Sequence, residues 1–148
     1  MRLAGKLVLA GVIGSIGAGC GSDSTGANGL PNIVGTWHAS SAVVTSVANP
    51  ATSSNLIALG ASLQVVFNAN LTYTSTVTIP GQAADVSNGT YVETATTLSL
   101  HDAVNPTDIV TFSMAVNGAA LVLTGGSPFT FDFGAGDVPA RFDLTLVH

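Results

Sequence analysis

The sequence predicts an all-β fold: a small antiparallel up-and-down meander barrel of about eight strands, preceded by a signal peptide and a flexible tether. Three observations predict this fold. Hydrophobic and polar residues alternate with a period of two over most of the chain after residue 32. Turn sequences recur at short intervals, which is typical of strands joined as hairpins. Only 7% of the residues are charged, and the polar remainder is mainly Thr, Ser, Asn and Gly, which suits strands and turns better than exposed helices.

Residues 1–19 have the features of a signal peptide. Arg2 and Lys6 give this segment a positive start, and residues 7–18 form an apolar stretch. That stretch is shorter than the roughly 20 residues needed to cross a hydrocarbon core, but it has the length of the apolar region of a signal peptide. The segment is therefore expected to direct export and to be removed.

Residues 17–20 read Gly-Ala-Gly-Cys, which resembles the lipobox of bacterial lipoproteins, although Gly17 stands where that motif usually has Leu. The resemblance implies cleavage before Cys20, lipid on Cys20, and a tether over residues 20–31. The alternative is an ordinary signal peptide that leaves a free thiol, but Cys20 is the only cysteine and has no intramolecular partner. The implied location is the bacterial cell envelope, and Gly21 after the cysteine slightly favours the outer membrane over the inner one.

The balance of charge excludes one class of partner. Loss of Arg2 and Lys6 with the signal would leave Arg141 as the only basic residue beside eight acidic ones. A nucleic acid needs Lys and Arg side chains to displace its counterions, and anionic lipid headgroups need a basic patch. The exported domain is therefore not expected to bind nucleic acid, and its contact with a membrane is expected through the lipid.

The barrel domain is expected to span residues 32–148. Turn sequences separate its strands at residues 68–70, at the Asn-Gly pair 117–118 and at residues 125–128. Residues 53–60 are the one helical candidate, a single turn or a lid, and residues 90–101 are either one bent strand or a hairpin. The expected strands are 33–47, 62–68, 71–79, 90–94, 97–101, 110–116, 121–123, 129–133 and 141–146.

The order Gly35-Thr36-Trp37, then a short loop, then a hairpin over residues 63–73 resembles the bacterial lipocalin-like domains. The resemblance covers about residues 33–148. It implies that Gly35 and Trp37 close one end of the barrel, with Arg141 from the last strand packed over the Trp37 indole. A cation over an indole contributes roughly 0.5–2 kcal/mol, which is a structural role. The resemblance also implies a small hydrophobic ligand in the mouth of the barrel.

The phenylalanines raise a question about that ligand. All six fall on faces expected to point inward, and an eight-stranded barrel has an interior that side chains can fill or that one small ligand can occupy. Two functions therefore remain open. One is a binding module, and the other is a structural or protein-interaction module of the envelope with a solid core. If the interior is open, the expected ligand walls are Tyr73, Phe112, Met114, Phe131 and Phe133.

The sequence does not predict an enzyme, a cofactor or a metal. His38 and His148 belong to no catalytic motif. The adjacent pair His101 and Asp102 could be a base with its carboxylate or two metal ligands, but its place before a turn favours a solvated role. Three carboxylates near the C-terminus could in principle surround a cation, yet their spacing matches no calcium loop, and a solubilising role is favoured. These three are Asp132, Asp137 and Asp143.

Overall fold

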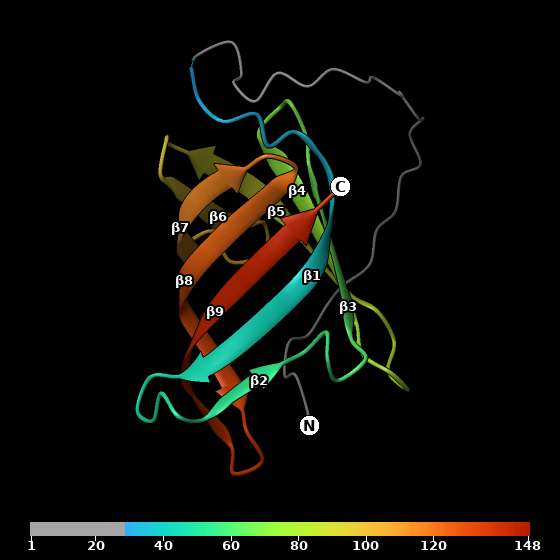
Figure 1. Ribbon diagram of the computed structural model, residues 1–148, viewed down its shortest axis with the longest axis vertical. Coiled ribbons are helices and arrows are strands. Elements are labelled where there is room, and N and C mark those ends of the chain that lie inside the picture. Colours follow the sequence, from blue (N-terminus) through green and yellow to red (C-terminus); the bar gives the residue numbers. More distant parts are fainter. Residues whose placement is uncertain (1–28) are drawn as a thin grey trace.

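Eight antiparallel strands close into a barrel in the computed structural model, which describes residues 29–148 (Figure 1). Each strand pairs with the next along the chain, and the last pairs back with the first between residues 38 and 46. This confirms the predicted all-β, up-and-down barrel. The barrel strands are β1 (Gly35–Ser46), β3 (Ser62–Phe67), β4 (Thr72–Thr78), β5 (Asp85–Glu93), β6 (Thr97–Asp102), β7 (Ile109–Asn117), β8 (Ala120–Asp132) and β9 (Asp137–Val147).

The helical candidate at residues 53–60 is a short strand followed by a single turn. Strand β2 (Ser53–Asn55) pairs with the second half of β1, beyond the segment of β1 that pairs with β3. The Leu59 N–H then donates to the Asn55 carbonyl at 3.2 Å, and the Ala61 N–H donates to the Leu56 carbonyl at 3.0 Å. Residues 90–101, left open between two alternatives, are a hairpin of β5 and β6.

The predicted turn at residues 125–128 is wrong, because β8 runs through it as one long strand. Its pairing with β9 shifts register between Leu123 and Gly126 and again between Gly126 and Phe129. Gly125 adopts a φ of 73°, a conformation that glycine reaches without steric cost. Extra residues in one strand of an antiparallel pair make a β-bulge, which bends the strand, so the glycines here bend the chain instead of reversing it.

One end of the barrel is closed by the chain that precedes β1. Residues 29–34 lie across this end, at the top of Figure 1. Ile33 is fully buried there, and its carbonyl accepts a hydrogen bond of 2.7 Å from Nε1 of Trp37. The His148 ring packs against the indole at a tilt of 34°, with a centroid separation of 3.8 Å. The other end, where the β4–β5, β6–β7 and β8–β9 connections lie, is called the open end below.

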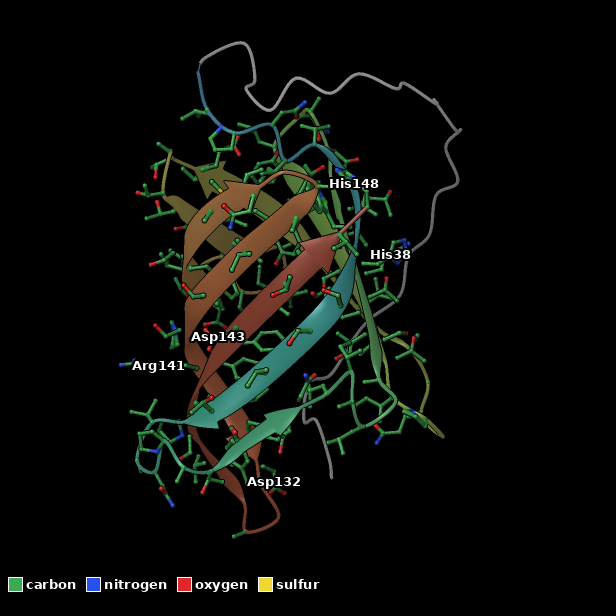
Figure 2. The ribbon with its side chains drawn as sticks, viewed as in Figure 1. His38, Asp132, Arg141, Asp143 and His148 are labelled. Atoms are coloured by element: carbon green, nitrogen blue, oxygen red, sulfur yellow. The ribbon has the colours of Figure 1, made fainter. Side chains whose placement is uncertain are left out.

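Arg141 does not cover Trp37, and this part of the expected end closure is wrong. Arg141 pairs with Thr45 near the far end of β1, and its side chain is exposed on the outer wall. Figure 2 shows it pointing away from the barrel, far from the end that carries His148. The physical reason is the antiparallel register, which places the C-terminal residues of β9, and not Arg141, beside the start of β1. His148 packs against the indole instead.

Candidate functional site

The barrel interior is filled in one half and hollow in the other. A cavity of about 490 Å³ occupies the half next to the open end and opens there to solvent. Its walls come from β3 to β9, and most of the wall residues are apolar. Pockets of roughly 300–1,000 Å³ with mainly apolar walls are typical of small-molecule sites. The apolar lining residues are Leu63, Val65, Leu100, Val104, Val110, Phe112, Phe129, Phe142 and Leu144.

Two aromatic rings of the cavity wall lie against glycines of the neighbouring strand. Tyr73 of β4 pairs with Gly89 of β5, and a Cβ atom on Gly89 would stand 3.0 Å from Cε1 of the tyrosine ring. Phe112 of β7 lies against Gly126 of β8, where a Cβ atom would overlap the ring. An aromatic side chain that covers a cross-strand glycine is a known device of curved sheets. Each of these rings therefore lies against bare backbone at the cavity wall.

An outward-facing carboxylate fixes the bulge beside Phe112. Oδ1 of Asp143, on β9, accepts a hydrogen bond of 2.6 Å from the backbone N–H of Gly125. Gly125 precedes the glycine against which the Phe112 ring lies. Hydrogen bonds to charged groups stabilise a protein by about 1.5–3 kcal/mol. Asp143 therefore acts on the shape of the cavity through the backbone of β8, not through contact with the cavity.

Polar side chains gather along the mouth of the cavity. Asp102 at the end of β6 is held in place, because its Oδ1 accepts hydrogen bonds from the backbone N–H of Val104 at 2.7 Å and of Asn105 at 2.9 Å. Burial raises the pKa of the Tyr73 phenol, and the negative charge of Asp102 raises it further, whereas a hydrogen bond with Ser87 lowers it. The phenol therefore stays neutral at physiological pH. The polar lining residues are Tyr73, Ser75, Asp85, Ser87, Asp102, Asn105 and Asp108.

The structure brings together only part of the predicted ligand wall. Tyr73 and Phe112 line the cavity. Met114 is buried two residues beyond Phe112 on β7 and does not line the cavity. Phe131 and Phe133 do not line it either, and their rings pack edge-on against each other in the β8–β9 hairpin, with centroids 4.9 Å apart. The prediction missed the stacked pair Phe129 and Phe142, with ring centroids 5.2 Å apart. Inward alternation marked both, but alternation does not say at which height of the barrel a side chain lies.

The candidate catalytic and metal-binding groups do not assemble. Asp102 lines the cavity, while the preceding His101 belongs to the opposite face of β6, because neighbouring residues of a strand point to opposite sides. Oδ1 of Asp132 accepts the N–H groups of Gly134 and Gly136 at 2.7 and 2.8 Å. These bonds lower the pKa of Asp132. Across residues 29–148 no group of three His, Cys, Asp or Glu side chains is placed to hold a metal.

Glu93 is a half-buried acidic residue in the other half of the barrel. It is on the inner face of β5, two residues beyond Tyr91, and pairs with Leu98 of β6. Its Oε2 is shielded from solvent and has no hydrogen-bond partner in the described part of the chain. Burial raises the pKa of this carboxyl above its usual 4.5. This residue does not line the cavity, and the sequence carried no signal for its burial beyond its place on an inward face.

The signal peptide, Cys20 and all but the last three residues of the predicted tether lie outside the described residues. Within residues 29–148 no helix is long and apolar enough to cross a membrane. The fold and the cavity together define the class of this protein, an eight-stranded antiparallel barrel with one closed end and a hollow open half. Neither a protein-family profile nor a curated protein sequence matches the chain.

Proposed function

We propose that this protein is a lipid-anchored lipoprotein of the bacterial envelope whose lipocalin-like barrel binds a small hydrophobic molecule. The cavity is the observation that supports binding. Its volume of about 490 Å³ lies within the range of small-molecule sites, and its walls are mainly apolar. A structural module with a solid core, the other function that the sequence leaves open, needs no such space. The proposed role is binding and not catalysis, since His101 and Asp102 occupy opposite faces of β6.

The proposed anchor is consistent with access to the cavity. The described chain begins at residue 29, and residues 29–34 lie across the closed end of the barrel (Figure 1). The described chain therefore enters the barrel at the end opposite the mouth of the cavity, so a tether that leads there from a lipid on Cys20 would not need to cross the mouth. Growth of a bacterial host with a labelled fatty acid is expected to label the wild-type protein and not the Cys20→Ser variant. Equal labelling of the two proteins, or labelling of neither, would contradict the anchor.

A fluorescent probe tests the binding function. N-phenyl-1-naphthylamine is neutral and apolar, and it brightens on leaving water. We expect the purified full chain to bind it saturably, with one probe per barrel. Leu100→Trp places a large ring into the cavity and is expected to remove most of the binding. Ser99→Trp is the matched control, because Ser99 is the neighbouring residue on the outer face, where its Oγ hydrogen-bonds Oγ1 of Thr111. Equal binding by both variants would contradict a site in the cavity.

A further inference from the structure

The charges around the cavity point to the kind of molecule that it holds. Three aspartates, Asp85, Asp102 and Asp108, contribute to its lining. Within residues 29–148 the only Lys or Arg is Arg141, which is exposed on the outer wall (Figure 2). The remaining polar lining residues are neutral. The polar side of the cavity therefore carries negative charge alone, at the end of an otherwise apolar space.

We infer that the cavity selects an amphiphilic amine, a molecule with an apolar body for the hollow half of the barrel and a protonated nitrogen for the aspartates at its mouth. This inference rests on the proposed binding function and adds the chemical class of the ligand to it. The apolar body would lie among Val65, Leu100 and Leu144, and the ammonium group would lie near Asp85, Asp102 and Asp108.

An anionic amphiphile such as a fatty acid does not fit this arrangement. Its carboxylate would add a negative charge beside the three aspartates, with no Lys or Arg in the lining to offset it. Like charges at close range repel, and they do so more strongly beside a low-dielectric wall than in water. An ammonium group reverses the sign of the interaction and can donate charge-assisted hydrogen bonds to the carboxylates. A neutral alcohol fills the same apolar space without either effect.

One of the three carboxylates, that of Asp102, is held in place before a ligand arrives, and the other two lie on residues placed by the backbone of the open end. The two backbone hydrogen bonds to Oδ1 hold Asp102 at the mouth. Asp85 begins β5, and Asp108 immediately precedes β7, where its own N–H donates to the Asn105 carbonyl at 2.8 Å. Groups placed in advance lose less freedom on binding, which raises the affinity they provide. The neutral phenol of Tyr73 and the hydroxyl of Ser87 complete the polar side.

Three ligands with the same chain and different head groups test the inference. Decan-1-amine, decan-1-ol and decanoate are titrated calorimetrically into the full chain near pH 7, below their micelle concentrations. We expect the amine to bind at least about tenfold more tightly than the alcohol, as one charge-assisted hydrogen bond can provide, and decanoate to bind most weakly. Added salt is expected to lower the affinity for the amine and to leave the affinity for the alcohol unchanged. This arm needs no variant.

Variants test whether the three carboxylates cause the preference for the amine over the alcohol. The triple variant Asp85→Asn, Asp102→Asn, Asp108→Asn keeps an acceptor oxygen for the Val104 and Asn105 N–H groups, and it is expected to bind the amine and the alcohol equally. Asp137→Asn is the matched control, since Asp137 is exposed at the same end of the barrel and does not line the cavity. It is expected to keep the preference for the amine.

The outcomes separate this inference from the proposed function. If the alcohol binds and the amine binds no more tightly, the inference is overturned and the binding function stands. Tighter binding of decanoate than of the amine overturns it as well. The same holds if Asp137→Asn removes the preference as completely as the triple variant does, because overall charge would then explain it. If none of the three ligands binds, the proposed function itself fails.

Discussion

At the scale of single residues, Glu93 is a group whose ionisation opposes folding. Its Oε2 is shielded from water and unpaired in the described chain. Burial favours the neutral form of a carboxyl and so raises its pKa. The folded state therefore holds this proton to a higher pH than the unfolded state does. As the pH rises from about 4.5 through the raised pKa, this residue makes folding progressively less favourable.

The substitution Glu93→Gln is expected to remove the loss of stability that ionisation of Glu93 causes as the pH rises. At pH 4 the variant and the wild type should have similar free energies of unfolding, because the carboxyl is protonated and close in shape to the amide. At pH 7 the variant should be the more stable of the two, because only the wild type carries an ionised group that burial disfavours. Urea unfolding of both proteins at the two pH values measures the difference. A difference that does not change with pH would contradict the assignment.

Single residues of the cavity were only partly predictable. Alternation along each strand correctly placed Tyr73 and Phe112 on inner faces. It could not tell them apart from Met114, which is also inward but lies in the filled half of the barrel. The height of a side chain in a barrel depends on strand tilt and stagger, which follow from the register of all eight strands. The local pattern of one strand contains no information about that register.

At the scale of elements, the bulged segment of β8 shapes one side of the cavity. Its bulged segment carries Gly126, against which Phe112 lies, and the bulge is held from outside by the bond between Asp143 and Gly125. The sequence suggested a turn here, since a cluster of Gly, Ser and Pro is typical of turns. The same residues also permit a bulge, and only pairing with β9 on both sides of them decides between the two.

Asp143→Ala is expected to loosen this bulge. The loss of the hydrogen bond to Gly125 should lower the free energy of unfolding by about 1–3 kcal/mol. The affinity for an apolar probe should also fall, because the backbone of β8 against which the Phe112 ring lies is no longer held in place. Asp143→Asn, which keeps an acceptor oxygen, should lose less of both. Urea unfolding and probe titration of the two variants measure these effects. Equal stability of both variants and the wild type would show that the bond does not hold the bulge.

The segment 53–61 illustrates a second limit of sequence reasoning at this scale. Its hydrogen bonds from Leu59 and Ala61 make a single turn, so the local pattern correctly indicated a turn. What the pattern missed is the role of Asn55. Its Oδ1 accepts the N–H of Ile57 at 3.1 Å, and the residue pairs with Val43 as part of β2. The side chain of Asn55 thus links strand β2 to the turn that follows it. The alternation of polar and apolar residues does not predict such a link.

At the scale of the whole molecule, the two ends of the barrel differ in construction. At the closed end, Trp37 donates a hydrogen bond to the Ile33 carbonyl and packs against the His148 ring. At the open end, the connecting loops leave the cavity accessible. The fold class and the meander order were predictable because alternation marks most of the strands and clear turn sequences mark two of the hairpins, at residues 68–70 and 117–118. The hollow half was not, because six inward phenylalanines are equally compatible with a filled core.

Native mass spectrometry of the full chain purified from a bacterial host tests the central claim, that the hollow half of the barrel holds a small molecule. We expect a discrete additional mass on the folded protein, absent after denaturation, lost in Leu100→Trp and kept in Ser99→Trp. A folded protein that shows only its own mass, and that takes up none of a mixture of apolar amines and alcohols, would contradict the claim.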